Sequence, residues 1–434
     1  MRARRATSCL IVAFVAVAFV VVVAACGGTE EEPPRTVSVF GPWLGEPADR
    51  LADVFRPFEE ATGIDVQYTG SSSFGRDIQE QIQEGNAPDL AIFSQPALLE
   101  QLAIDGEIQP LPATIASQVR KEAPGDVLAA VDDGQGNLVG VPFRSHLKSL
   151  VWYSPSQFKK RGYRAPTTWV EFGTLANRMR SDGLTPWCVG FRAVGSSNGW
   201  PGTDWIEDLV LRLHGGAVYD AWVSGNIPFD DPRIEEAFTV FEEQVLRPGQ
   251  TLGGRRAILS TDWRVAGDPL LQDKPECMLH RNASFYEENL PSGVEIGPDG
   301  DLDVFILPPI NPAVGKTVII SGEQVAALNL RPETEQLLAF LATPEAGGPW
   351  AAQSGFISPY MDGPREFGRE FERRVSDEIR SADIIRFDGS DLMTPSVGSG
   401  SFYDAILGFV RNRDFIDAAA VAEDGRPYTL SVEP

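Results

Sequence analysis

The sequence has few of the residues from which metal centres and acid–base active sites are usually built. Only three histidines occur among its 434 residues, His146, His214 and His280, and they lie far apart. Its four cysteines form no CxxC pair and no Cys/His quartet, which disfavours a structural zinc site. A Walker A motif, a dinucleotide-binding glycine fingerprint and an HExxH sequence are also missing. We therefore expect neither a metal nor a cofactor.

Basic residues are scarce relative to acidic ones. The chain has 37 Lys and Arg against 61 Asp and Glu, a formal charge of −24 at pH 7. Nucleic-acid binding needs clustered Lys and Arg to neutralise phosphates, and peripheral attachment to anionic lipid needs them too, so both are disfavoured. A composition of 43% hydrophobic and 23% charged residues is typical of globular proteins, and the length suits two or three domains.

The first 25 residues have the features of an export signal. Residues 1–5 are basic, residues 10–23 are apolar, and Val23-Ala24-Ala25-Cys26 resembles the bacterial lipobox. We predict a lipoprotein signal peptide at 1–25, lipid on Cys26 and a flexible acidic tether at 26–35. The alternative is an uncleaved transmembrane helix, for which Cys9–Ala25 is at the short limit of about 17 residues. The prediction places the protein outside the plasma membrane, in contact with it through the lipid alone.

Export also changes how the remaining cysteines are interpreted. Cys9 leaves with the signal and Cys26 carries the lipid, so Cys188 and Cys277 remain in the mature chain. Two cysteines in an oxidising compartment suggest one disulfide. Two buried free thiols are the alternative.

Strand and helix patterns alternate at the start of the mature chain. Short apolar runs at 36–40, 64–68 and 89–93 predict strands, and residues 47–62 and 74–84 have the apolar spacing of helices. This order predicts a parallel sheet with helical crossovers, which binds ligands at the carboxyl ends of its strands. The loop at 41–46, with Trp43 and Glu46, and the pair Ser94-Gln95 follow such strands.

Farther along, the pattern indicates a second α/β unit. A strand begins at Leu150, Thr168 and Glu171 have the spacing of a helix capping box, and a further strand is expected at 186–191. A helix is expected after Asp204, with Trp200 in the loop before it, and Trp205 is assigned to the core.

No catalytic motif withstands inspection. Gly195–Gly199 matches G-x-S-x-G, but Trp200-Pro201 follows it, and no Asp and His downstream suggest a triad. Asp299–Asp303 begins like a calcium loop, yet valine and isoleucine replace the required glycine and glutamate. We read the first as a Ser/Gly loop and the second as an acidic turn. Paired glycosidase carboxylates have no fixed spacing, so a carbohydrate-active enzyme remains an alternative.

Three segments resemble a known family when taken together with the lipobox. They are GWPGTDWIED (199–208), KSLVWYSP (148–155) and CMLHRNASF (277–285). This combination resembles the family 1 extracellular solute-binding proteins of ABC importers, in particular the branch that handles α-glucosides. The resemblance implies a periplasmic-binding-protein type II-like fold, with two doubly wound α/β lobes joined by a hinge and a sugar in the cleft between them.

On this basis the first lobe comprises residues 36–145 and 308–343, and the second comprises 146–307 and 344–434. A sugar needs aromatic rings for its apolar face and polar side chains for its hydroxyl edge. The ligand contacts that loop position, composition and the resemblance together predict are Trp43, Glu46, Ser94, Gln95, Arg144, Lys148, Trp200, Asp204, Gly322, Glu323, Trp350 and Gln353. The alternatives are a core-capping role for Trp200, an exposed loop for Trp43 and Glu46, and ion pairs with surface acids for Arg144 and Lys148.

The resemblance also implies partners and assembly. We expect a monomer that binds a small carbohydrate and delivers it to the permease subunits of an ABC transporter. A secreted carbohydrate-active enzyme and a lipoprotein that binds a peptide or another solute are the competing hypotheses.

Replacement of Cys26 tests the anchor. Because the thiol is the acceptor of the lipid, Cys26→Ala should release the protein from membranes or leave its precursor unprocessed. Membrane fractionation and intact mass measure both. A variant that is fully processed and still bound to the membrane would contradict the prediction.

Overall fold

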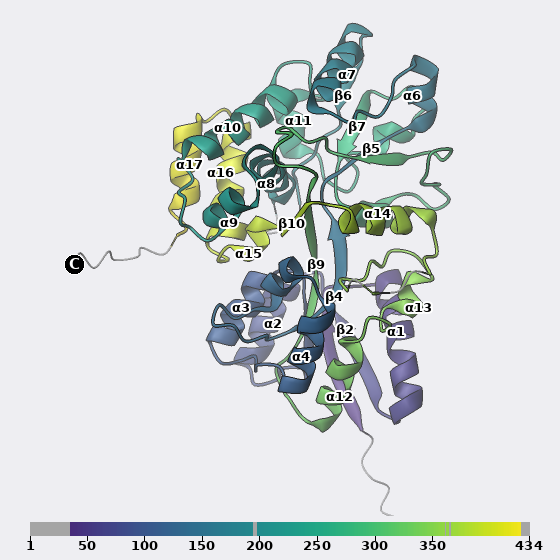
Figure 1. Ribbon diagram of the computed structural model, residues 1–434, viewed down its shortest axis with the longest axis vertical. Helices are drawn as coiled ribbons and strands as arrows, with labels where there is room; N and C mark the ends of the chain where they lie inside the picture. Colours follow the sequence, from purple (N-terminus) through teal and green to yellow (C-terminus); the bar gives the residue numbers. More distant parts are fainter. Residues whose placement is uncertain (1–34, 194–197, 361, 364–365, 427–434) are drawn as a thin grey trace, which may run out of the picture. The chain divides into compact units, whose positions relative to one another are not determined.

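Two β-sheets organise the part of the chain that the computed structural model describes, which is residues 35–193, 198–360, 362–363 and 366–426. One sheet has six strands and the other has four (Figure 1). Helices accompany both, which confirms the predicted α/β class. The predicted signal peptide, the predicted lipid site Cys26, and Gly195, Ser196 and Ser197 of the G-x-S-x-G motif lie outside the described residues.

The first sheet begins as the sequence predicts. Strands β1 (Thr36–Gly41), β2 (Asp65–Gly70) and β3 (Leu90–Phe93) are parallel, with β1 in the middle. Helices α1 (Glu46–Thr62) and α2 (Phe74–Gln83) make the crossovers, and the apolar face predicted for α1 is buried. The carboxyl ends of β1 and β3 therefore lie at the same edge of the sheet.

A strand from much later in the sequence completes this sheet and makes it mixed. Strand β9 (Thr317–Ala327) lies antiparallel to β3, with Leu90 opposite Ala327, and antiparallel to β4 (Val141–Leu147). The first four residues of β9 pair in parallel with β10 (Ile384–Phe387). All eleven residues of β9 are buried, so it is an interior strand of the sheet.

The second sheet has the order β6-β7-β5-β8. Its strands are β5 (Leu150–Tyr153), β6 (Thr185–Trp187), β7 (Cys277–Arg281) and β8 (Asp303–Ile306). Because β4 ends at Leu147 and β5 begins at Leu150, only two residues connect the two sheets at this point.

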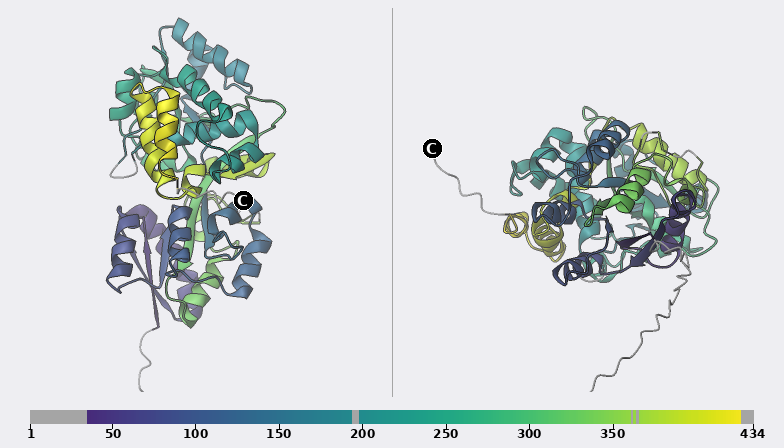
Figure 2. Two further views of the ribbon diagram at one scale, coloured as in Figure 1. Left: turned by 90° about the vertical axis from the view of Figure 1, so that its left-hand side faces the viewer. Right: turned by 90° about the horizontal axis from the view of Figure 1, so that it is seen from below.

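Fifteen further α-helices are present in the described residues. They are α3 (Pro96–Ile104), α4 (Ala113–Glu122), α5 (Gly125–Leu128), α6 (Pro155–Arg161), α7 (Trp169–Ser181), α8 (Trp200–His214), α9 (Gly216–Val223), α10 (Pro232–Phe241), α11 (Gly254–Ser260), α12 (Pro332–Leu341), α13 (Gly348–Ala351), α14 (Glu370–Arg380), α15 (Gly389–Leu392), α16 (Phe402–Val410) and α17 (Phe415–Glu423). Helices α8, α10, α16 and α17 pack together into a second hydrophobic core (Figure 2, left view, teal and yellow).

The predicted division into lobes stays a prediction, but two elements depart from it. Residues 344–434 were assigned to the second lobe, yet α13 packs against α1 and β10 extends the sheet that contains β1. The reason is that β9 continues beyond its contact with β3, so its first residues offer a free edge to which β10 adds.

Two local predictions on the second unit can be compared with the structure. The capping box of Thr168 and Glu171 is confirmed at the start of α7. The loop expected around Trp200 is wrong, because α8 begins at Trp200 itself and Asp204 lies one turn inside the helix. Gly199, with φ 118°, lets the chain turn directly into the helix, and Pro201 occupies a first-turn position where no amide donor is needed.

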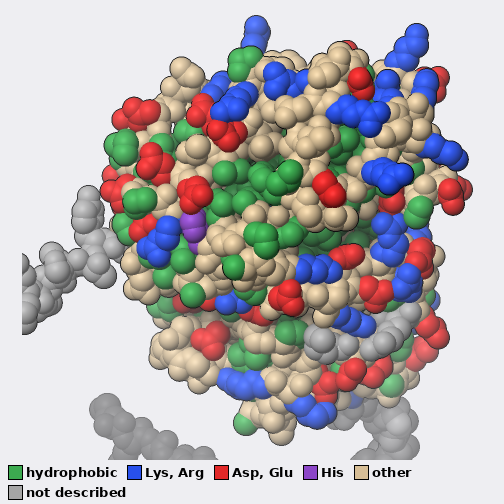
Figure 3. Space-filling view, turned by 45° about the horizontal axis from the view of Figure 1, so that its top comes forward, with side chains coloured by type: hydrophobic (Ala, Val, Ile, Leu, Met, Phe, Trp, Pro, Cys, Tyr) green, Lys and Arg blue, Asp and Glu red, His purple; other side chains and the backbone are tan. Residues whose placement is uncertain are grey.

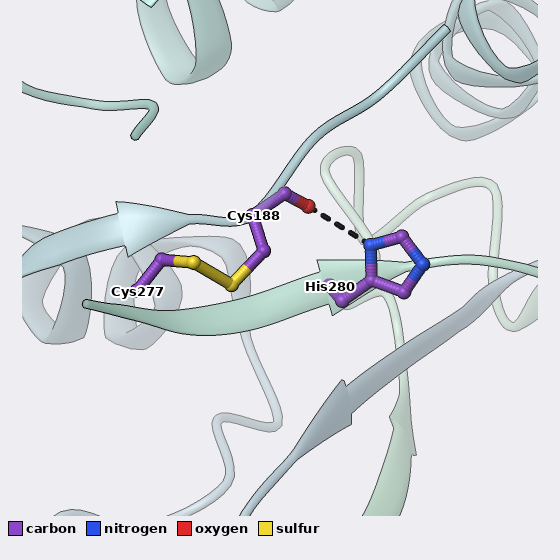
Figure 4. Close-up of a disulfide and its surroundings, with 3 residues drawn as sticks. All are labelled: Cys188, Cys277 and His280. Carbon is purple, nitrogen blue, oxygen red and sulfur yellow. Dashed lines mark hydrogen bonds between the residues drawn. A yellow bond between two sulfur atoms is a disulfide. The ribbon is translucent and has the colours of Figure 1, made fainter. Parts of the chain in front are cut away.

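Cys188 and Cys277 form the disulfide that the cysteine count suggested (Figure 4). Cys188 directly follows β6 and Cys277 begins β7, so the bond joins neighbouring strands. Nδ1 of His280 lies 2.9 Å from the carbonyl oxygen of Cys188, and Nε2 lies 3.2 Å from the side-chain amide of Asn282. A neutral imidazole that donates from Nδ1 and accepts at Nε2 satisfies both contacts.

Acidic and basic side chains are interspersed over the face shown in Figure 3, and Lys and Arg side chains project from its upper and right-hand edges. Within the described residues, no helix is both long enough and apolar enough to cross a lipid bilayer.

The buried His280 predicts a pH dependence of stability. Burial lowers the pKa of His280 from 6.5 to about 4, so the unfolded chain takes up a proton at a higher pH than the folded one. The contribution of the neutral His280 to the unfolding free energy is complete above pH 6.5 and is lost as the pH falls towards 4. The loss is about 3 kcal/mol of unfolding free energy by pH 4.

Urea unfolding of the wild type and His280→Gln between pH 4 and 7 measures this. Each protein gives a curve of unfolding free energy against pH, and subtracting one curve from the other cancels the titration of the carboxylates. The difference in unfolding free energy should change by about 3 kcal/mol over this range. Parallel curves would contradict the prediction.

Candidate functional site

A cavity of about 250 Å³ lies where the carboxyl end of β3, the strands β4 and β9 and the start of α8 meet. Its lining includes seven of the twelve predicted ligand contacts, namely Ser94, Gln95, Lys148, Trp200, Asp204, Gly322 and Glu323. Seven further residues line it, namely His146, Phe285, Ser321, Asp388, Ser390, Asp391 and Tyr403. The structure thus brings together residues from seven separate parts of the sequence.

The aromatic wall of the cavity is formed by Trp200 and its neighbours. The ring of Trp200 packs against Trp263 with centroids 5.1 Å apart and against Phe285 at 5.8 Å. Trp263 and Phe285 also contact each other, at 5.8 Å. Because Trp200 is only partly buried, this cluster presents aromatic surface to the cavity.

Lys148 provides the positive charge of the cavity, and other side chains hold it in place. Its ammonium lies 3.1 Å from Oδ1 of Asp204 and 2.7 Å from Oδ2 of Asp388. The same nitrogen lies 4.9 Å from the centroid of the Trp200 ring, a cation–π contact. A buried ammonium needs such partners, because its transfer from water would otherwise cost several kcal/mol.

The two acids share this ammonium unequally. Burial raises the pKa of Asp204 to about 7, and Lys148 offsets only part of that effect. Burial acts in the same direction on Asp388, but the closer Lys148 ammonium and the hydroxyl of Ser390 outweigh it and lower the pKa of Asp388. Asp388 is therefore the carboxylate that holds its charge more firmly.

The position of Asp388 depends on the short helix α15. Its carboxylate caps this helix by accepting from the amide of Asp391 at 3.1 Å and from the hydroxyl of Ser390 at 2.9 Å. Glu207 of α8 accepts from the amides of Gly389 and Ser390, at 2.7 and 3.2 Å. Helix α8 thus fixes α15 at the wall of the cavity.

Glu323 and His146 form a further part of the cavity wall. The two side chains come from β9 and β4, and Nε2 of His146 lies 3.3 Å from the Glu323 carboxylate. Burial would raise the pKa of Glu323, but His146 and Arg144 outweigh it, so the pKa lies below its usual value. At Gly322 a Cβ atom would lie 2.0 Å from the Arg144 carbonyl oxygen, so only glycine permits this approach of β4 to β9.

The remaining five predicted contacts lie outside this cavity. Trp43 and Trp350 are buried against each other with centroids 5.1 Å apart. The guanidinium of Arg144 lies 4.7 Å from the Trp350 centroid and pairs with Glu288. Trp43 and Trp350 belong to the hydrophobic core that contains β1, and the buried Arg144 packs against them.

Glu46 and Gln353 are surface residues in the same region. Glu46 begins α1 and lines a separate cavity of about 260 Å³ together with Arg50 and Glu288. The side-chain amide of Gln353 donates to Asp53 at 2.8 Å. As ligand contacts, the twelve residues remain predictions.

Several residues of the cavity were missed, for identifiable reasons. Phe285 lies in the CMLHRNASF segment, and Trp263 is one of nine tryptophans, so both had a signal in the sequence. No signal in the sequence pointed to Asp388, Asp391 and Tyr403, because they lie about 180–200 residues after Trp200 and belong to no motif.

One group of acids in the described part of the chain has the spacing of a cation site. Oxygens of Asp204, Glu207 and Asp388 lie within 4.8 Å of one another. The ammonium of Lys148 already contacts two of these carboxylates. We therefore interpret the group as an internal ion-pair network.

A larger hollow adjoins the cavity. It has a volume of about 810 Å³ and shares Ser94 and Gln95 with the cavity. Residues of α2, among them Phe74 and Gln79, form one side, and Pro395 and Ser399 also contribute. The two spaces therefore adjoin at Ser94 and Gln95.

Comparison with known proteins identifies the family. Residues 40–348 match the family model described as bacterial extracellular solute-binding protein. The chain belongs to this family. It is thus an extracellular solute-binding protein, and the prediction of a binding protein rather than an enzyme is confirmed.

Two relatives are similar over nearly their whole length. The osmoprotective compounds-binding protein GgtB of Synechocystis is 35% identical over 401 residues, which cover 91% of this chain and 94% of the relative. The α-glucosides-binding periplasmic protein AglE of Rhizobium meliloti is 34% identical over 395 residues, with coverage of 89% and 86%.

Among solved structures, the bacterial solute receptor AcbH, which is described as having an exclusive preference for β-D-galactopyranose, has a similar fold. The TM-score is 0.73 at 19% identity, with 91% of this chain and 98% of that chain covered. This similarity confirms the predicted periplasmic-binding-protein fold of the solute-binding protein.

The position of Trp43 predicts a role in stability. Removal of a buried tryptophan leaves a cavity and costs about 3–5 kcal/mol, so Trp43→Ala should lower the unfolding free energy by that amount. Urea denaturation measures the loss, with Trp43→Phe as the milder control. Unchanged stability combined with weaker ligand binding would instead indicate that Trp43 contacts the ligand.

Proposed function

We propose that the protein captures a sugar, an α-glucoside or another small oligosaccharide, and delivers it to the permease subunits of an ABC importer. The observation that carries this proposal is the partly exposed Trp200 ring in a cavity otherwise lined mainly by polar side chains. Such a ring suits the C–H face of a sugar, and the carboxylates, hydroxyls and amide around it suit the hydroxyl edge.

The chemistry of the cavity wall matches sugar recognition in further detail. Asp204, Glu323 and Asp391 supply acceptors, Gln95 supplies both a donor and acceptors, and Ser94 and Ser390 supply hydroxyls. Each sugar hydroxyl can donate one hydrogen bond and accept others, so a mixed set is what several hydroxyls require.

The extent of the cleft supports a ligand of more than one ring. The space at Trp200 is about 250 Å³, and the hollow of about 810 Å³ beside α2 shares Ser94 and Gln95 with it. A disaccharide with its inner ring at Trp200 would extend in that direction.

The relatives support the same class of ligand. The family model and both named relatives cover most of the chain, and one relative is named for α-glucosides and the other for osmoprotective compounds. A peptide would more often need backbone partners, whereas the described wall of the cavity consists of aromatic and polar side chains.

We further propose that the receptor is a monomer tethered to the outer side of the membrane by lipid on Cys26. The lipobox-like sequence before this residue and the acidic segment after it support this arrangement. No other membrane contact is part of the proposal.

Replacement of Trp200 tests the site. A sugar face on tryptophan removes on the order of 60–100 Å² of apolar surface from water, worth about 1.5–2.5 kcal/mol. Trp200→Ala should therefore weaken binding by about ten-fold or more. Calorimetry with maltose, trehalose, sucrose and raffinose identifies a ligand and measures the loss.

Trp169→Ala is the matched control. Like Trp200, Trp169 is a partly buried first residue of a helix, but it packs on Phe172, away from the cavity. This control should bind with wild-type affinity, and all bound sugars should be recovered uncut. Equal affinity of the wild type and Trp200→Ala would place the binding site elsewhere, and hydrolysis of the sugar would favour the enzyme hypothesis.

A further inference from the structure

The charged side chains of the cavity are predominantly acidic. Four carboxylates line it, those of Asp204, Glu323, Asp388 and Asp391, against the single ammonium of Lys148 and the imidazole of His146. No arginine is found among the described residues of this lining. The cavity lining thus holds more acidic than basic side chains.

The cations of the lining are already engaged. The Lys148 ammonium contacts Asp204 and Asp388 and lies over the Trp200 ring. The imidazole of His146 faces the Glu323 carboxylate. An anionic ligand could gain a contact with either group only by drawing it away from a buried carboxylate, which would then lose its partner.

Asp391 is the acid that differs from the other three. Asp388, Asp204 and Glu323 each have a basic side chain within 3.4 Å of their carboxylates. Asp391 lies in α15, where its backbone amide donates to Asp388. Burial and the charges of Asp388, Asp204 and Glu323 raise the pKa of Asp391, with Lys148 opposing them. A cationic donor from the ligand beside Asp391 would oppose this rise in pKa, and a further anion there would add to it.

We propose that the cavity accepts neutral and amino-substituted glycosides, rejects glycosides that carry a carboxylate or phosphate, and uses Asp391 as the residue that sets this preference. This inference rests on the proposed sugar-binding function and adds the charge class of the ligand. The geometry that supports it is the engaged state of both cations beside Asp391, an acid for which the described residues supply no ion pair.

A series of derivatives at one sugar carbon tests the proposal without a change in size. The parents are maltose, trehalose and sucrose, each also prepared with a glucose CH₂OH group replaced by carboxylate, carboxamide or aminomethyl. Calorimetry with the mature chain at low ionic strength measures all four forms of each parent. Low salt is used because screening would reduce the contrast.

The expected order is definite. For a parent that binds, the carboxylate form should bind at least ten-fold more weakly than the carboxamide, and the aminomethyl form at least as tightly as the carboxamide. Asp391→Asn should reduce the carboxamide-to-carboxylate ratio by three-fold or more. Asp417→Asn, which removes one exposed acid from α17, should leave that ratio unchanged.

The contrary outcomes separate the two proposals. Equal binding of the carboxylate and carboxamide forms, or binding of carboxylate forms alone, would overturn the charge preference while the sugar-binding function stands. A wild-type preference that persists in Asp391→Asn would overturn the role of Asp391. If no form of any parent binds, the proposed function fails and the charge preference fails with it.

Discussion

The ammonium of Lys148 joins three parts of the chain that are distant in sequence. Lys148 lies in the two-residue connection between β4 and β5, Asp204 lies in α8, and Asp388 caps α15. A buried charge is tolerated only where its partners are in place, so the position of each element constrains the other two. The neighbouring Ser149 adds to this constraint, because its hydroxyl donates to Asp208 of α8 and accepts from the amide of Ile319 in β9. The cavity is thus built around a network that also holds together the connection between the two sheets.

Local patterns in the sequence predicted local structure well. The strands and helices predicted within 36–93, the capping box of Thr168 and Glu171 and the pairing of Cys188 with Cys277 all agree with the structure. Each depends on a signal within a few residues or on a simple count. The start of α8 was predicted wrongly, because the sequence Trp200-Pro201-Gly202 is typical of a loop. In the structure it forms the first turn of the helix after Gly199.

The predicted site was partly recovered, and its errors share one cause. Trp43 and Trp200 both stand beside glycine and proline in the sequence, yet Trp43 packs on Trp350, which lies about 300 residues away, and Trp200 faces a cavity. Tryptophan suits a protein core as well as a sugar face, and only the tertiary partner distinguishes the two roles. For the same reason Asp388 and Asp391 could not be predicted, since their significance comes from Lys148 and α8 rather than from their own surroundings in the sequence.

Strand β9 lies late in the sequence, and this affects how the chain folds while it is being exported. Strands β1, β2 and β3 are among the first to appear, but the open edge of β3 meets its partner only when residues 324–327 follow. Until then this edge of β3 is unpaired, and an unpaired strand edge promotes pairing with other chains. A receptor that must fold outside the cytoplasm therefore depends on rapid delivery of its last third, and a slow or interrupted export would leave an N-terminal fragment prone to aggregation.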